Sequence, residues 1–330
     1  MIYLFKKYGW LMILVCLVNL PILIFGSIRT DQTVTLKGDT TKVENFVEID
    51  QAFTSSGSFS TIYVISFDHS TILQNWLLSA STTATLATIS DSYQHFTDAE
   101  TRAMGRIQHN ASIQYSLIVA YRQASQIDPK IHLDYTFNGY LVSYYSSESD
   151  FRIGDRIVAI NDLSYTDPTF SEHFSKRKTG DIVTVERNSR LLEITLSDTN
   201  HVIGGYADYR IDDENAFPNY TILPTNVGGP SGGLLQTLAL YDALLEEDLT
   251  GGKKIAGTGT ISVDGTVGII GGIVQKIYTA YDDDIDLFLC PKDNYEEALT
   301  AYNRLPHPEK MKLYSVATFE DALRILEENR

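Results

Sequence analysis

Ser231 stands in a glycine-rich turn, "GGPSGG" (228–233), directly before an apolar run that is typical of a helix. A serine hydroxyl becomes a strong nucleophile when a neighbouring base takes its proton. The start of a helix also exposes backbone N–H groups, which attract anions. Three chemistries therefore fit this turn: an α/β-hydrolase nucleophile, a phosphate cradle and a serine–lysine dyad.

The first two chemistries find little support elsewhere in the chain. The turn satisfies G-x-S-x-G, the α/β-hydrolase pattern, but its triad would have to be Ser231/Asp284/His307, since His307 is the sole later histidine. No clear strand leads directly into the turn. A P-loop requires Gly-Lys-Ser or Gly-Lys-Thr, which the chain lacks. The seven histidines show no HExxH spacing. We therefore expect no ATP, no metal and no other cofactor.

Lys276 is the lysine best placed to act as a base. In "GGIVQKIYTAY" it shares a helix face with Ile273 and Ala280. A lysine accepts a proton only when neutral, so its pKa must fall from ~10.4 to about 7–8. Burial and a nearby helix N-terminus both act in that direction. Spacing alone leaves open whether this side chain is buried or extends to solvent.

The segment "GTGTISVDGTVGIIGGIVQK" (257–276) and the turn "GGPSGG" together resemble the catalytic core of Lon-type serine–lysine peptidases. From Thr258 to Lys276 the chain follows the family pattern T-G-x-x-x-x-x-G-x-V-x-x-x-G-G-x-x-x-K without a gap. The resemblance places the nucleophile at Ser231 and the general base at Lys276. It places Thr258 on a threonine that forms a hydrogen bond near the lysine.

Two glycines beside the nucleophile are expected to support it. Gly229 and Gly232 give the backbone room, and N–H groups around Ser231 are candidates for an oxyanion hole. Gly232 departs from the family, in which alanine is usual at this position. The added backbone freedom should not abolish the chemistry.

The elements that must position these residues follow from the patterns of the C-terminal third. Strands and helices alternate from about residue 201, with a hairpin predicted at Asp264-Gly265 and a helix beginning after 271–272. A strand is predicted at 284–291, in which Cys290 is buried. Thr318 is predicted to cap the last helix.

Residues 135–197 are similar to a PDZ domain of the kind associated with bacterial proteases. The similarity rests on "FNGY" (Phe137, Asn138, Gly139 and Tyr140), at the position of the carboxylate-binding loop, and on "GDRIVAIN" (154–161). It implies that a glycine turn holds the carboxylate of a peptide while that peptide adds as a strand. A plain spacer domain is the alternative. A helix is predicted at 112–124, before this region.

The N-terminal sequence is typical of a membrane anchor. Lys6 and Lys7 precede an apolar run from Trp10 to Phe25, which with its flanks approaches the ~20 residues that a bilayer requires. The lysines favour a cytoplasmic N-terminus. A cleaved signal peptide is the alternative, although its apolar core is usually shorter.

Composition excludes some partners. The formal net charge is −16, so the chain would repel nucleic acid. Its two cysteines, Cys16 and Cys290, could not pair if the first lies in a membrane, so the fold does not depend on disulfides.

We expect an α+β multidomain protein in four parts. They are a cytoplasmic stub and transmembrane anchor (1–30), a β-rich N-terminal region (31–110), a PDZ-like domain (111–200) and a Lon-like peptidase domain (201–330). This arrangement resembles the PDZ-containing Lon-like peptidases of Gram-positive bacteria. The resemblance implies an extracellular serine endopeptidase for exported peptides or flexible protein segments, and it allows a homo-oligomer. The alternative from another class is a non-catalytic scaffold that binds peptides.

Overall fold

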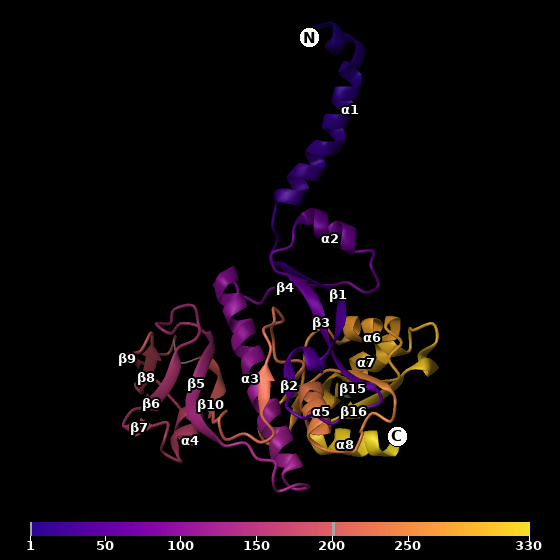
Figure 1. The fold of residues 1–330 in the computed structure, drawn as a ribbon. Helices are drawn as coiled ribbons and strands as arrows, with labels where there is room; N and C mark the ends of the chain where they lie inside the picture. The colour runs from indigo at the N-terminus through magenta and orange to yellow at the C-terminus, as the bar shows by residue number, and fades with distance from the viewer. Residues whose placement is uncertain (1, 200–201) are drawn as a thin grey trace.

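A computed structural model describes residues 2–199 and 202–330. Helix α1 (Ile2–Ser27) extends away from the rest of the molecule, which is built mainly on two six-stranded β-sheets (Figure 1). Within it, Gly9–Ser27 forms 19 residues with a mean hydropathy of 2.3 that bury nothing against the body. By length and composition, this helix can cross a membrane.

The mixed sheet has six strands in the order β16-β15-β12-β3-β1-β4. The strands from β16 to β3 pair in parallel, whereas β1 is antiparallel to both β3 and β4. The bounds are Gln32–Lys42 (β1), Ser58–Phe67 (β3), Thr85–Thr88 (β4), Lys254–Gly257 (β12), Leu287–Pro291 (β15) and Lys312–Val316 (β16).

Helices cover both faces of this sheet because its central strands are apolar on both faces. In β15, Leu287 and Leu289 pack with α5 and α8, and the alternate residues Phe288 and Cys290 pack with α6 and α7. The sheet is thus the middle one of three layers. The helices are α5 (Gly233–Leu244), α6 (Ile273–Asp282), α7 (Tyr295–Tyr302) and α8 (Phe319–Glu328).

The antiparallel sheet also has six strands, in the order β10-β5-β6-β8-β9, with β7 paired to β6. Aromatic and aliphatic residues of its inner face form a separate core with α4. The bounds are Tyr135–Tyr145 (β5), Arg156–Ile160 (β6), Leu163–Ser164 (β7), Phe170–Ser175 (α4), Ile182–Arg187 (β8), Arg190–Thr195 (β9) and Ile203–Ile211 (β10).

Short elements complete the fold, and several of them confirm sequence predictions. The hairpin turns at Asp264-Gly265, and the Thr318 side chain accepts a hydrogen bond from the N–H of Asp321 at the start of α8. The remaining bounds are Val43–Asn45 (η1), Val47–Ile49 (β2), Ile72–Leu78 (α2), Tyr220–Ile222 (β11), Thr260–Ile261 (β13), Val267–Gly268 (β14), Lys292–Asn294 (η2) and Pro308–Lys310 (η3).

The helix predicted at 112–124 begins much earlier in the structure, as α3 (Asp98–Ala124). The Thr97 hydroxyl accepts from the N–H of Glu100 at 3.3 Å, and the Glu100 carboxylate accepts from the N–H of Thr97 at 3.0 Å. This reciprocal pair is a capping box. The T-x-x-E pattern marks the start that hydrophobic periodicity missed. α3 runs between the two sheets (Figure 1).

The predicted boundaries at residues 110 and 200 cut through both sheets. β1 and β3 come from the expected N-terminal region, yet they complete the sheet of the C-terminal third. β10 was expected in the peptidase domain, yet it pairs along β5. Strands remote in sequence join because an unpaired edge would leave backbone groups without partners. Local patterns do not report such pairing.

Candidate active site

Ser231 lies at the start of α5, in a turn fastened to the residues that follow β12. Its carbonyl oxygen accepts hydrogen bonds from the N–H of Gly259 at 2.8 Å and from the Thr258 hydroxyl at 3.0 Å. The N–H of Leu234 donates in return to the carbonyl oxygen of Gly259 at 3.0 Å. These three bonds fix the position of the nucleophile's backbone.

Lys276 approaches Ser231 from the opposite layer. It lies in the first turn of α6, on the other face of the sheet from α5. Because β12 ends at Gly257, side chains of the two helical layers meet beyond the end of this strand. The Nζ of Lys276 is 2.9 Å from the Oγ of Ser231 and 3.0 Å from the Oγ1 of Thr258.

The surroundings of Lys276 favour its neutral form. The side chain is buried, with 1% of the residue exposed. Burial lowers its pKa to about 7, because an ammonium ion loses its hydration there. Lys276 forms no ion pair with any residue that the structure describes, so no carboxylate offsets this effect. A neutral amine at 2.9 Å can accept the proton of the Ser231 hydroxyl.

Helix α3 supports the nucleophile turn from outside the C-terminal third. The Ser112 hydroxyl lies 3.2 Å from the carbonyl oxygen of Pro230, and the Ser116 hydroxyl donates to the carbonyl oxygen of Gly233 at 3.0 Å. Four residues separate the two serines, so they share one helix face. Both serines are buried, so water does not compete for these hydrogen bonds.

Sequence reasoning missed this role of α3. Gly105, His109, Ser112 and Ser116 recur every three or four residues, which forms a small or polar stripe along the helix. Such a stripe is a signal that the helix packs against polar backbone. It could have been found from the sequence once the helix start was placed correctly.

A cleft of about 160 Å³ opens beside the dyad. Phe46, Tyr63 and His109 line it together with Ser231 and Lys276, and its lining contains no carboxylate and no arginine. The His109 ring packs 5.7 Å from the ring of Phe46, and burial lowers the pKa of His109. The cleft walls are thus largely uncharged at neutral pH.

The alternative triad is wrong. His307 lies beyond α7 with its side chain 61% exposed, and its ring pairs with Glu309. Asp284 follows the end of α6. The Oγ of Ser231 has Lys276 as its hydrogen-bond partner instead.

The four residues predicted to form a carboxylate-binding loop lie within β5 and not in a loop. Tyr140 pairs with Ala207 of β10 on one side and with Ile157 of β6 on the other. The side chain of Asn138 donates to Asp208 at 2.8 Å. Both edges of the strand are occupied at Tyr140, so no peptide can add there. The predicted loop is therefore wrong, whereas peptide binding by these residues and the PDZ-like identity of the region stay predictions.

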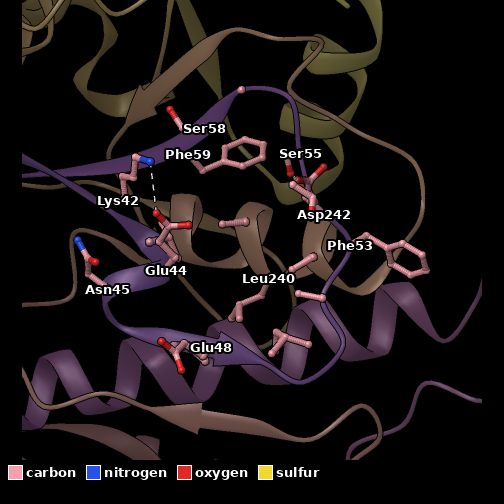
Figure 2. A pocket seen from close by; sticks show the side chains of 18 of the residues that line it. Lys42, Glu44, Asn45, Glu48, Phe53, Ser55, Ser58, Phe59, Leu240 and Asp242 are labelled. Atoms are coloured by element: carbon pink, nitrogen blue, oxygen red, sulfur yellow. Dashed lines mark hydrogen bonds and ion pairs between the residues drawn. The ribbon is translucent and has the colours of Figure 1, made fainter.

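A second cavity, of about 630 Å³, lies away from the dyad, between residues 42–59 and the C-terminal half of α5. Figure 2 shows Leu240 and Asp242 of α5 facing it. Burial raises the pKa of Asp242, which accepts hydrogen bonds from Ser55 and from the N–H of Leu249. The bond from Ser55 fastens the segment around it to α5, and the bond from Leu249 fastens the residues that follow α5. We assign the cavity no catalytic role.

Comparison with known proteins places the dyad in a defined segment. Residues 218–327 match the model of the Lon protease (S16) C-terminal proteolytic domain. The chain is 35% identical to the Lon protease of Campylobacter jejuni over 97 residues, which is 29% of this chain and 12% of that protein. It is 26% identical to the Lon protease of Mycoplasma mycoides over 151 residues, which is 46% of this chain and 18% of that protein.

A third relative agrees with these two. The chain is 28% identical to the Lon protease of Chlamydia pneumoniae over 122 residues, which is 33% of this chain and 14% of that protein. The chain thus spans less than a fifth of the length of each of these relatives. The matched segment contains Ser231, Thr258 and Lys276, and this similarity and their geometry together support a serine peptidase with a Ser–Lys dyad on a Lon-type proteolytic domain.

Proposed function

We propose that this protein is a membrane-anchored serine endopeptidase that cleaves exported peptides or flexible protein segments without ATP. One observation carries the proposal: the Nζ of Lys276 is buried, has a pKa of about 7, and lies 2.9 Å from the Oγ of Ser231. A base with such a pKa is neutral in a large fraction of molecules at neutral pH, as general-base catalysis requires.

In the proposed mechanism, Ser231 attacks the carbonyl carbon of the scissile peptide while Lys276 takes the hydroxyl proton. The resulting ammonium ion gives this proton to the leaving amine, which departs and leaves an acyl-enzyme. Thr258 accepts a hydrogen bond from the Nζ and so orients the amine toward Ser231. A water molecule, activated by the again neutral Lys276, then hydrolyses the ester.

Backbone N–H groups at the start of α5 are suited to stabilise the oxyanion. The N–H groups of Ser231 and Gly232 donate to no acceptor in the part of the chain that the structure describes. They lie at a helix N-terminus, where the helix dipole favours negative charge. Gly229, by contrast, donates its N–H to the carbonyl oxygen of Gly105. We therefore assign the oxyanion to Ser231 and Gly232, and we assign Gly229 to shaping the turn.

The peptide substrate is expected to bind as an extended strand. β12 pairs with β3 only as far as Thr61, so the following residues Ile62, Tyr63 and Val64 have no strand on that side among the described residues. The same three residues line the cleft beside Ser231. A free strand edge binds extended peptides through backbone hydrogen bonds. A folded protein would first have to expose a flexible segment, because the chain contains no P-loop motor.

The anchor decides on which side of the membrane cleavage takes place. Lys6 and Lys7 precede the apolar helix, and positive residues remain on the cytoplasmic side. We therefore propose that the body lies outside the cell, as in the PDZ-containing Lon-like peptidases of Gram-positive bacteria that it resembles. In this proposal the antiparallel sheet belongs to a PDZ-like unit that binds substrate or regulates cleavage.

The test uses the full-length protein in lipid nanodiscs and an unfolded protein as substrate. Ser231→Ala and Lys276→Ala should each abolish cleavage. Lys292→Ala, which removes an exposed lysine directly after β15, should leave cleavage unchanged. Cleavage that survives both dyad substitutions would refute the mechanism. A wild-type protein that binds the unfolded substrate and never cuts it would support the non-catalytic scaffold instead.

A further inference from the structure

Helix α2 has an apolar side that nothing in the described structure covers. Trp76 is 70% exposed and Leu77 is 59% exposed, and no residue of the helix is buried. Burial of large apolar side chains is a main contribution to the stability of short helices. A seven-residue helix that leaves its tryptophan uncovered therefore needs another environment to bury it.

Backbone hydrogen bonds attach α2 to the end of the membrane-spanning candidate. α1 ends at Ser27. The N–H of Thr30 then donates to the carbonyl oxygen of Ser70 at 2.8 Å, and the N–H of Ile72 donates to that of Ile28 at 3.1 Å. Figure 1 shows α2 between α1 and the sheet, lying across the direction of α1. α2 is therefore held beside the C-terminal end of α1, where the apolar stretch of α1 also ends.

The sequence around α2 carries no charge. From Ser70 to Ser90 there is no Asp, Glu, Lys or Arg, although the whole chain has 42 acidic and 26 basic residues. Acidic side chains on this surface would be repelled by anionic lipid headgroups. A neutral, hydroxyl-rich stretch beside an exposed tryptophan suits the boundary between headgroups and acyl chains.

We propose that α2 lies in the interface of the bilayer that α1 crosses, with Trp76 and Leu77 in contact with lipid. This inference rests on the proposed membrane anchor. Tryptophan prefers the headgroup level of a membrane, and helices that lie in the membrane plane bury their apolar side at the acyl boundary. Two attachments, one spanning and one in the plane, would fix the orientation of the peptidase body relative to the membrane.

The two tryptophans of the chain make the test direct, because one lies in each attachment. The full-length Trp10→Phe variant carries Trp76 as its single tryptophan, and Trp76→Phe carries Trp10. Each is reconstituted into phosphatidylcholine–phosphatidylglycerol vesicles, with and without lipids brominated near the headgroup. We expect the brominated lipids to quench Trp76 emission, with a blue-shifted spectrum and weak quenching by aqueous acrylamide.

A third reporter separates a specific contact from general adsorption. Phe53 is 49% exposed on the body, and its N–H donates to the carbonyl oxygen of Ala243 near the end of α5. Phe53→Trp is made in a chain that also carries Trp10→Phe and Trp76→Phe. The emission of the new tryptophan should be quenched by acrylamide and not by brominated lipid. Lipid quenching of this reporter equal to that of Trp76 would overturn the assignment of the contact to α2.

The outcomes distinguish the two proposals. If Trp10 is quenched by brominated lipid while Trp76 is quenched only by acrylamide, the anchor holds and the role of α2 is refuted. If Trp10 is not quenched by lipid, the anchor itself fails, and the interfacial helix fails with it. Leu77→Asp in the Trp10→Phe chain should restore acrylamide access to Trp76 by placing a charge at the lipid boundary.

Discussion

The carbonyl oxygen of Gly105 in α3 accepts a hydrogen bond of 2.9 Å from the N–H of Gly229, two residues before the nucleophile. Gly229 has a φ of +88°, a conformation that glycine adopts readily. Gly105 lies outside the segment that matches the Lon proteolytic domain. α3 also contacts the antiparallel sheet, where the Tyr115 hydroxyl donates to the carbonyl oxygen of Ala207 at 2.7 Å. One helix thus links the antiparallel sheet to the nucleophile turn.

Ser112→Ala should lower kcat about tenfold with little change in KM, because losing one buried hydrogen bond costs about 1–2 kcal/mol. The substitution removes a hydroxyl that lies 3.2 Å from the carbonyl oxygen of Pro230 and 3.0 Å from the Oε1 of Gln236, and it lets the turn shift. Asn110→Ala, at an exposed position of the same helix, is the matched control and should be neutral. Equal kcat values for both variants would show that α3 does not position Ser231.

Thr258→Val should lower kcat about 10- to 100-fold while the fold is kept. Valine has nearly the shape of threonine, but it cannot accept the hydrogen bond from Lys276 or donate to the carbonyl of Ser231. A buried polar group left unpaired costs about 1–3 kcal/mol. Thr258→Ser restores the hydroxyl and should recover most of the activity. Steady-state kinetics on the three proteins, with circular dichroism as a check on folding, decides the matter.

Cleavage should depend on the neutral form of Lys276, whose pKa burial lowers to about 7. The value of kcat/KM should therefore rise with pH through about 7 and level off above it, since protonated Lys276 cannot accept a proton. Lys276→Arg should be inactive at every pH, because an arginine keeps its charge in proteins. A profile that stays flat from pH 5 to 9 would contradict the role of Lys276.

The same group should leave a signature in stability. Between about pH 7 and pH 10.4 an unfolded lysine keeps a proton that the folded state has lost, so the free energy of unfolding rises with pH in this window. Lys276→Met replaces the amine by an apolar group of similar length and removes this dependence. The free energy of unfolding of the Met variant minus that of the wild type should fall by on the order of 4 kcal/mol from the lower to the upper end of this pH window. Urea unfolding at several pH values would measure it, and parallel curves would exclude the shift.

Substitution by alanine should be tolerated at Gly232 and should destabilise the protein at the adjacent Gly233. A Cβ on Gly232 would lie 3.1 Å from the side-chain ends of Gln236 and Thr61, which can move, so Gly232→Ala should retain activity. A Cβ on Gly233 would lie 2.9 Å from the backbone nitrogen of Ile261. Gly233→Ala should therefore destabilise the protein by about 1–3 kcal/mol. Thermal unfolding compares the pair, and a stable Gly233→Ala protein would show that the turn has more room than the structure gives it.

The sequence by itself determined the dyad and the elements that carry it. The gap-free pattern from Thr258 to Lys276 placed the lysine in the first turn of a helix, and the structure confirms the hairpin, that helix and the cap at Thr318. These features were readable because they depend on short-range geometry: a tight turn, a helical repeat and a cap each involve residues close in sequence.

Only the tertiary structure decided whether Lys276 is sufficiently buried to be a base and which residues hold Ser231 in place. Burial depends on both helical layers meeting beyond the end of β12, and no local pattern reports that. The support from Ser112, the sheet formed by β3 with β12, and the paired edges of β5 all join residues far apart in the chain. Buried backbone groups must form hydrogen bonds, and which remote residue supplies the partner depends on how the whole chain packs.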